Sequence, residues 1–404
     1  MIRKDLAKYV LKNIWNRRLR SFLTVISVVI GIAAIASLIS FGQGISTYVE
    51  GIAQQMGEDK LLVQPRGFGF GPSVDSNIRL DDSDVQAIES VASIAEASGV
   101  YMFSAEIVSH GQRRFAQAFG MDYGQHEKLI NEVYDLELVA GNKLRGSEKS
   151  KAILGYNYQV PDKIFEKPLK AGDKVRINNN AVEIEGFYES LGNPIDDANI
   201  YLAHDAAEDI FGMKSFQFII VRAVPGESPS RAVKQVRKAL LNHRSQNAGS
   251  EDFFVETFEQ VIASFTSVLA IVTTVVILIA LISLVVASVN ITNTMYTSIL
   301  ERTKELGVFK AVGAKNADIM MVVVLESGLL SLLGGVIGTL AGIAFSSAAG
   351  KIIAAAGYAA FSPLVTWQLV AGALLFSLVI GIVAGIFPAY QASRLRPVDA
   401  LRYE

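Results

Sequence analysis

Residues 267–289 read SVLAIVTTVVILIALISLVVASV, and this stretch contains no Asp, Glu, Lys or Arg. A charged side chain at the centre of a bilayer costs several kcal/mol, and about 20 apolar residues in a helix are needed to cross it. The charge-free run around this stretch extends from Gln260 to Leu300, so we interpret it as a membrane-spanning helix. The positions of similar runs elsewhere in the chain decide the fold.

Three further charge-free runs are present, at 21–49, 327–350 and 352–393. The first lies near the start of the chain, and a polar stretch separates it from the run at 260–300. A content of 51% hydrophobic residues agrees with a membrane protein that also has a sizeable polar domain.

Basic residues gather in three segments: 1–20, the connection between the second and third runs, and the end of the chain. By the positive-inside rule these segments are cytoplasmic. The connection between the third and fourth runs has only Lys351, which fits the outer face. The first run has no short apolar region followed by a cleavage site, so we interpret it as an uncleaved anchor. We therefore expect a multi-pass protein of the plasma (inner) membrane, with cytoplasmic N- and C-termini and the polar domain extracytoplasmic.

The predicted fold class is membrane α-helical, with four transmembrane helices and a large extracytoplasmic α+β domain inserted between helices 1 and 2. The predicted divisions are a cytoplasmic amphipathic helix at 1–20, transmembrane helix 1 at 21–42, the extracytoplasmic domain at 43–262, transmembrane helix 2 at 263–290, a cytoplasmic helical segment at 291–318, transmembrane helix 3 at 319–350, transmembrane helix 4 at 364–389, and a cytoplasmic C-terminal segment at 390–404.

The predicted extracytoplasmic domain mixes strand and helix patterns. It contains 22 basic and 32 acidic residues, so it is acidic, although the net charge of the whole chain is only −2. Asp82 and Ser83 are the candidates for the helix cap at the start of 81–91. Strands are predicted at 61–64, 101–108, 113–121, 152–154, 174–177, 182–187 and 216–222, and helices at 81–91, 204–211 and 228–241.

Two segments leave alternatives open. In 1–20, apolar and basic residues separate onto two faces, which favours a helix lying on the inner leaflet over a plain extension of the first span. The sequence PRGFGFGP at 65–72 is followed by no helix, so it does not match a dinucleotide-binding loop. This loop is either mobile or contacts lipid, a partner or cargo through Phe68 and Phe70.

Signatures of catalysis are missing from the sequence. The phosphate-loop pattern and the nucleophile elbow do not occur, and the four histidines are scattered without the spacing of a metal site. The chain has no cysteine, which excludes disulfides and thiolate metal ligands. We expect no catalytic residue, no metal, no cofactor and no nucleic-acid partner for this chain. The charge-free spans also lack the acidic or histidine partners of an ion-coupled carrier, so any driving energy must come from a partner.

Small residues recur at every fourth position in the last two spans. Such stripes allow helix backbones to approach closely in lipid, either within one chain or between two. The third span has Gly334, Gly338, Gly342, Ser346 and Gly350, and the fourth has Ala373, Ser377, Gly381, Gly385 and Ala389.

The connection between the second and third spans has the composition of a compact helical element. Glu301 and Glu305 lie one helical turn apart beside Lys304, and Gly307 and Gly313 bracket a short apolar segment. A short loop with positive residues would satisfy the topology equally well.

The run from Ser283 to Gly342 resembles the C-terminal permease signature of the MacB/FtsX superfamily of ABC transporters, and the segment from Gly385 to Arg402 resembles the last cytoplasmic segment of the same family. The 43–262 domain is less specifically similar to the family's periplasmic core domain. The residues that show the resemblance most clearly are Asn290, Met295, Glu301-Arg302, Glu305-Leu306-Gly307, Lys310-Ala311, Gly313-Ala314, Asp318-Ile319 and Glu326.

The resemblance implies a permease that acts as a dimer, with a second copy or a paralogue. It also implies docking on a separate cytoplasmic ABC ATPase that binds ATP and Mg, because this chain begins directly with the amphipathic helix, where MacB itself has a fused nucleotide-binding domain. An extracytoplasmic adaptor or effector is a further expected partner. The ATPase-coupling residues that the resemblance implies are Glu301, Arg302, Lys304, Glu305, Leu306, Gly307, Lys310, Ala311, Gly313, Ala314, Arg394, Pro397 and Leu401, and the expected helix-packing residues are Gly334, Gly338, Gly342, Gly381 and Gly385.

Three functions remain open from the sequence. The first is a membrane subunit that transmits ATPase motion for export or mechanotransmission. The second is an FtsX-like signalling subunit that controls an extracytoplasmic partner and transports no cargo. The third is a membrane-anchored binding domain without an ATPase.

Overall fold

The computed structural model describes residues 18–57, 59–66, 79–212, 214–358 and 362–402. The amphipathic helix predicted at 1–20 and the loop at 65–72 lie almost wholly outside these residues. The chain divides into two compact units. We call them the helical unit (residues 1–46, 267–353 and 361–404) and the polar domain (residues 47–266 and 354–360).

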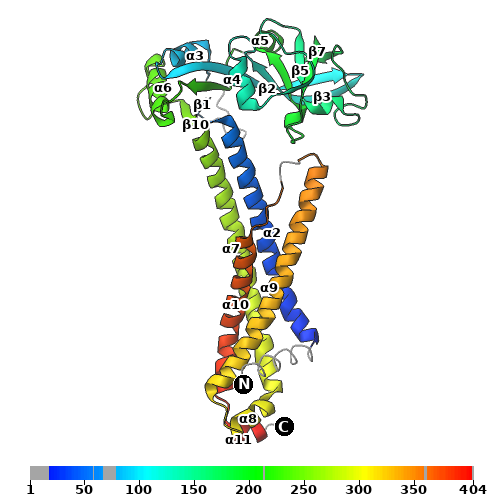
Figure 1. Ribbon diagram of the computed structural model, residues 1–404, viewed down its shortest axis with the longest axis vertical. Coiled ribbons are helices and arrows are strands. Elements are labelled where there is room, and N and C mark those ends of the chain that lie inside the picture. Colours follow the sequence, from blue (N-terminus) through cyan, green and yellow to red (C-terminus); the bar gives the residue numbers. More distant parts are fainter. Residues whose placement is uncertain (1–17, 58, 67–78, 213, 359–361, 403–404) are drawn as a thin grey trace. The chain divides into compact units, whose positions relative to one another are not determined.

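Four helices of the described chain are long and apolar enough to cross a membrane, and the polar domain is inserted between the first and second of them. Each helix continues beyond its apolar core, because few residues that break helices interrupt it. The last of them begins at Trp367 because the side chain of Thr366 caps its first turn, accepting from the backbone N–H of Leu369. The four are α2 (Arg18–Met56), α7 (Phe258–Glu301), α9 (Asn316–Ala355) and α10 (Trp367–Ser393), shown in Figure 1.

One stripe of small residues on α9 packs against α2. A Cβ atom placed on Gly334 would lie 2.8 Å from Cβ of Val28, and one on Gly342 would lie 2.6 Å from the carbonyl oxygen of Ala33. Gly338 makes the same kind of contact one turn along, where a Cβ would lie 2.9 Å from the carbonyl oxygen of Val29. Only glycine allows the two backbones to come this close.

The stripe on α10 packs against another face of α9. A Cβ on Gly381 would lie 2.6 Å from the carbonyl oxygen of Ser327, and one on Gly385 would overlap the side chain of the same serine. The hydroxyl of Ser331 donates to the carbonyl oxygen of Ser377 at 2.5 Å across this contact. Both stripes thus make their contacts within a single chain.

The polar domain is built on one mixed sheet of ten strands, in the order β10-β1-β9-β2-β3-β8-β5-β7-β4, with β6 pairing β2 and β7. The β3–β8 and β5–β7 pairings are parallel and the others are antiparallel. Strands β4, β8 and β10 were not predicted from the sequence. The strands are β1 (Lys60–Pro65), β2 (Ile94–Ser109), β3 (Gln112–Met121), β4 (Leu138–Gly141), β5 (Lys151–Leu154), β6 (Lys174–Ile177), β7 (Asn180–Tyr188), β8 (Ile200–Ala203), β9 (Phe218–Ala223) and β10 (Phe253–Thr257).

Helices pack on both faces of this sheet. Along β9, Ile219 and Val221 join a core with α3 and α6, whereas Ile220 between them joins a core with α4. Since successive side chains of a strand point to opposite faces, the two cores lie on opposite sides of the sheet. The helices are α3 (Asp82–Glu89), α4 (Glu127–Tyr134), α5 (His204–Phe211) and α6 (Pro229–His243).

The cap of α3 differs from the prediction. Asp81, and not Asp82 or Ser83, is the N-cap, and its carboxylate accepts from the backbone N–H groups of Ser83 and Asp84. Asp84 in turn accepts from the backbone N–H of Asp81, which completes a capping box. The prediction was wrong because the buried Asp84 selects the residue three positions earlier as its partner.

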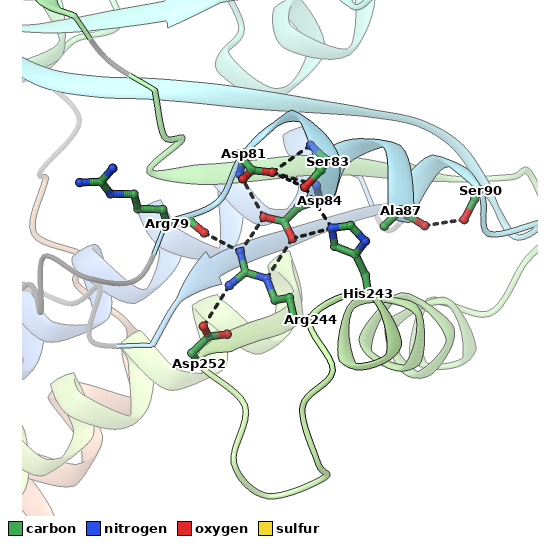
Figure 2. A network of polar contacts seen from close by, with 9 residues as sticks. All are labelled: Arg79, Asp81, Ser83, Asp84, Ala87, Ser90, His243, Arg244 and Asp252. Carbon is green, nitrogen blue, oxygen red and sulfur yellow. Dashed lines mark hydrogen bonds and ion pairs between the residues drawn. The ribbon is translucent and has the colours of Figure 1, made fainter.

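Arg244, just after α6, fastens this cap to the sheet, as Figure 2 shows. Its guanidinium lies 2.6 Å from the buried carboxylate of Asp84 and 2.9 Å from that of Asp252, next to β10. The same group donates to the carbonyl oxygen of Arg79. One side chain therefore joins α3, α6 and β10.

Candidate functional site

The 291–318 segment is helical for almost its whole length. Helix α7 continues to Glu301, α8 covers Thr303–Ala311 and α9 begins at Asn316. Gly313 makes the turn between α8 and α9, with φ of +105° and its N–H donating to the carbonyl oxygen of Lys310. After α10, a short helix α11 (Pro397–Arg402) packs on α8, and Figure 1 shows the two together at one end of the helical unit.

Arg302 lies at the break between α7 and α8 and pairs with Glu326 of α9. Its Nη2 atom is 2.9 and 2.7 Å from the two carboxylate oxygens and 2.7 Å from Oγ of Ser298. Arg302 is 7% exposed and Glu326 5% exposed. A buried pair of this kind needs such additional hydrogen bonds to offset its desolvation, and it fixes the α7–α8 junction against α9.

Lys310 holds the other end of α8. Its ammonium group donates to the carbonyl oxygens of Ser393 at 2.5 Å and Leu395 at 2.9 Å. The last carbonyls of a helix have no partner within the helix and concentrate negative partial charge, so a lysine is well placed there. Lys310 thereby joins α8 to the C-terminal end of α10.

Gly307 brings α8 against α11. A Cβ atom at this position would lie 2.7 Å from Cβ of Ala400, closer than two carbons can approach. Leu306 beside it is buried with Ile299, Ile319 and other apolar residues from α7, α9 and α10. Helices α7 to α11 therefore meet in one packed element, which we call the end knot (residues 298–326 and 389–400).

The residues expected for ATPase coupling differ in how deeply they are buried in the end knot. Arg302, Leu306 and Gly307 are buried and hold it together, and Lys310, Ala314 and Pro397 are partly buried. The guanidinium of Arg394 stacks 4.5 Å from the ring of Tyr390. Leu401 belongs to α11, but its side chain lies outside those described. The exposed members are Glu301, Lys304, Glu305, Ala311, Gly313 and Arg394.

Several residues of the end knot were absent from the expected set. Four apolar side chains of α8, its C-terminal turn and α11 are exposed: Val312 at 85%, Val398 at 71%, Val308 at 48% and Phe309 at 44%. The spacing of these four residues in the sequence does not show that their side chains are exposed. For Glu326 the sequence did contain a signal. It is the only ionisable residue between Asp318 and Lys351, so it requires a partner.

Models of two known protein families match parts of this chain. The model of the MacB-like periplasmic core domain matches residues 21–239, and that of the FtsX-like permease C-terminal domain matches residues 277–397. The chain belongs to the MacB/FtsX family of ABC transporter permeases. The resemblance seen in the sequence is thereby confirmed.

Relatives of this MacB/FtsX permease cover it from end to end. An uncharacterized ABC transporter permease of Methanocaldococcus jannaschii is 33% identical over 99% of this chain and 98% of its own length. The ABC transporter permease YknZ of Bacillus subtilis is 26% identical over 98% of each chain. The macrolide export ATP-binding/permease protein MacB of Chlorobium luteolum is 28% identical over 97% of this chain, which spans 59% of that protein.

Solved structures similar to the permease cover about half of it. The periplasmic region of MacB from Actinobacillus actinomycetemcomitans matches 52% of this chain and 94% of that one, with 17% identity and a TM-score of 0.43. The extracellular domain of the transporter YknZ matches 49% of this chain and all of that one, with 14% identity and a TM-score of 0.39.

Family membership makes this chain a transmembrane ABC permease subunit with an extracellular domain. Permeases of this family generally act as dimers and with an ATPase partner, and some relatives, such as MacB, combine ATP-binding and permease parts in one protein.

Proposed function

We propose that the permease receives the motion of a separate cytoplasmic ATPase at its end knot and transmits it across the membrane to the polar domain. The observation that supports this most directly is the set of contacts made by α8. Arg302 joins its start to α9, Lys310 joins its end to α10, and Gly307 seats it on α11. A displacement of α8 therefore moves the ends of the spanning helices together with it.

The exposed apolar side chains of the end knot are the proposed docking surface for the ATPase. Exposed apolar groups on a cytoplasmic surface favour a protein partner. Lys304, Lys315 and Arg394 around them are exposed, and the positive-inside rule places such a basic segment in the cytoplasm. In this arrangement ATP and Mg are bound by the partner, and both termini of the permease are cytoplasmic.

Co-expression with a candidate ABC ATPase subunit tests the docking surface. We expect the ATPase to co-purify with the wild-type permease in mild detergent and to be lost with Val312→Asp, because this side chain is exposed and its change leaves the packing intact. Val139→Asp, the same substitution at an exposed position of the polar domain, is the matched control. Retention of the ATPase by Val312→Asp, together with unchanged ATP hydrolysis in Glu301→Lys and Gly313→Trp, would contradict the proposal.

A second copy or a paralogue is the proposed partner within the membrane. Asn290, Thr292 and Asn293 of α7 and Gln391 of α10 line an open cavity of about 720 Å³ in the helical unit. Amide side chains in a membrane-spanning unit favour a partner that can hydrogen-bond them. Because the chain has no cysteine, Asn293→Cys alone would report a dimer contact by disulfide cross-linking. Failure to cross-link, while the protein migrates as a dimer, would place the contact elsewhere.

An FtsX-like signalling role is the second candidate. The close contacts of α9 with α2 and with α10 leave no room at those interfaces even for a methyl group, so cargo cannot pass between these helices. Such a bundle is well suited to transmit movement to an extracytoplasmic adaptor or effector. Purification from the native membrane distinguishes the two roles: a wall-active hydrolase in the complex favours signalling, and an efflux adaptor favours export.

A further inference from the structure

Pro388 lies inside helix α10 and is buried there. A proline has no backbone N–H, so the carbonyl oxygen four residues earlier, that of Ala384, loses the partner it would have in an unbroken helix. A buried carbonyl oxygen requires a donor, and a neighbouring helix can provide one inside a membrane. Prolines inside helices are also the usual place at which helices bend.

Thr292 of α7 supplies the missing donor. Its hydroxyl oxygen lies 2.9 Å from the carbonyl oxygen of Ala384 and 3.0 Å from that of Ser288 in its own helix. A hydroxyl group has one proton, so it donates fully to only one of these two oxygens at a time. Thr292 therefore keeps a partner within α7 when α10 moves away.

The hydrophobic packing of the helical unit changes at the same level. Ala384, before the proline, belongs to a core formed with α2, α7 and α9, whereas Ala389, after it, belongs to a separate core with α7, α8 and α9. Helix α7 passes from the first core to the second between Met295 and Ile299. Pro388 thus lies at the boundary between two separately packed cores.

The two parts of α10 are also attached to different neighbours. Before the proline, Gly381 and Gly385 are in close contact with Ser327 of α9. After the proline, the ammonium group of Lys310 from α8 binds the carbonyl oxygens of Ser393 and Leu395. A movement of α8 is therefore passed to the last turn of α10, while the part before the proline remains packed on α9.

Helix α8 is itself bounded by breaks in the helical backbone. Helix α7 ends at Glu301, just before α8, and Gly313 makes the turn into α9 with φ of +105°. Pro388 is the corresponding break in the hydrogen bonding of α10. Each covalent connection from the bundle to α8 and to the last turn of α10 thus passes through such a break.

We propose that α10 bends at Pro388 and that Thr292 is the latch of this joint. In the closed position the hydroxyl of Thr292 donates to the carbonyl oxygen of Ala384. When the last turn of α10 moves with α8 and α11, the hydroxyl donates to Ser288 instead. The inference rests on the proposed coupling role, because it names the movement that an ATPase at the end knot would drive.

The test measures the distance between two spin labels on the full chain in nanodiscs, without any ATPase. Because the chain has no cysteine, Leu375→Cys on α10 and Val398→Cys on α11, exposed by 64% and 71%, place the labels on the two sides of the joint. We expect a major and a minor distance. Thr292→Val should raise the population of the minor one about threefold to tenfold, the effect of losing one hydrogen bond.

Three variants serve as controls. Thr292→Ser keeps the hydroxyl and should behave as the wild type. Thr297→Val, on the same helix, removes a hydroxyl that donates only to the carbonyl oxygen of Asn293 in α7, so it should change nothing. In a Pro388→Ala background the new backbone N–H supplies the carbonyl of Ala384, so Thr292→Val should have no effect.

Three results would overturn the proposal: an unchanged distance distribution in Thr292→Val, an equal change in Thr297→Val, or the same effect of Thr292→Val with and without Pro388. Valine matches threonine in shape, so the first comparison remains informative even if Pro388→Ala unfolds, and a thermal melt of each variant verifies folding. Because no ATPase is present, failure of the joint is distinguished from failure of the coupling role, which the loss of the ATPase in Val312→Asp tests.

Discussion

Arg302 and Glu326 form a buried ion pair across 24 positions of sequence, with two N···O distances of 2.9 and 2.7 Å. The arginine comes directly after the last residue of α7, and the glutamate lies in the N-terminal half of α9. The pair therefore ties the end of α7 to α9 at the point where α8 begins.

Removing one member of this pair should destabilise the helical unit strongly. Glu326→Gln leaves the Arg302 charge buried without its counter-charge, which costs about 3–5 kcal/mol. The double variant Arg302→Met/Glu326→Leu replaces the pair with apolar groups of similar size and should recover most of that loss. Thermal unfolding in detergent measures both. Additive losses in the double variant would show that the two side chains do not depend on each other.

The contact between α8 and α11 should be sensitive to a single methyl group. Gly307→Ala places a Cβ atom 2.7 Å from Cβ of Ala400, so α11 must shift. We expect ATPase stimulation to fall at least severalfold, with partial recovery in Gly307→Ala/Ala400→Gly. ATP hydrolysis by the reconstituted complex is the measurement. Equal activity in the wild type and Gly307→Ala would exclude a tight α8–α11 contact during coupling.

Bulky side chains in the glycine stripe should separate α9 from α2. Gly342→Leu would place a side chain against the backbone of Ala33, at a predicted cost of several kcal/mol. Gly372→Leu on α10 is the matched control, because a Cβ there meets nothing within 4 Å. We expect a lower melting temperature only for the first variant, measured in the same detergent.

The stability of the polar domain should depend on pH through His126. Its Nδ1 atom lies 2.7 Å from Asp122 and its Nε2 atom 3.4 Å from Glu89, and Glu96 is also nearby. The hydrogen bond to Asp122 raises the pKa of His126 above its ordinary value of 6.5, although burial opposes the shift. The same bond lowers the pKa of Asp122 to about 2.

A group whose pKa is raised by folding stabilises the fold fully below its unfolded pKa, and loses that contribution as the pH rises through its folded pKa. His126→Gln should therefore lower the melting temperature at about pH 6 more than at about pH 9. Asp122 acts in the opposite direction, and its contribution is lost only as the pH falls below about 4 toward 2. A His126→Gln deficit that is the same at both pH values would show that the histidine is neutral in the fold.

Local composition was sufficient to predict the spanning helices, their order and the insertion of the polar domain. Lipid excludes charge, so a run such as 267–289 has few alternatives whatever it packs against. Period-two patterns also predicted strands such as β6 and β7. The turn between them was predictable as well, because Asn178 and Asn179 adopt positive φ, which few residues other than asparagine and glycine tolerate. Strand β8 was missed because it is only four residues long and is buried on both faces, so it has no alternation.

Tertiary structure alone decided which side chains meet. The sequence by itself determined that Arg302 and Glu326 flank apolar segments, but their pairing depends on how α7 and α9 pack. It likewise placed Thr292 and Pro388 in two separate charge-free runs, and only the packing of α7 against α10 brings the hydroxyl of Thr292 to the carbonyl oxygen of Ala384. The physical reason is that insertion in a membrane follows from summed local transfer energies, whereas a site is made by distances between residues far apart in the chain.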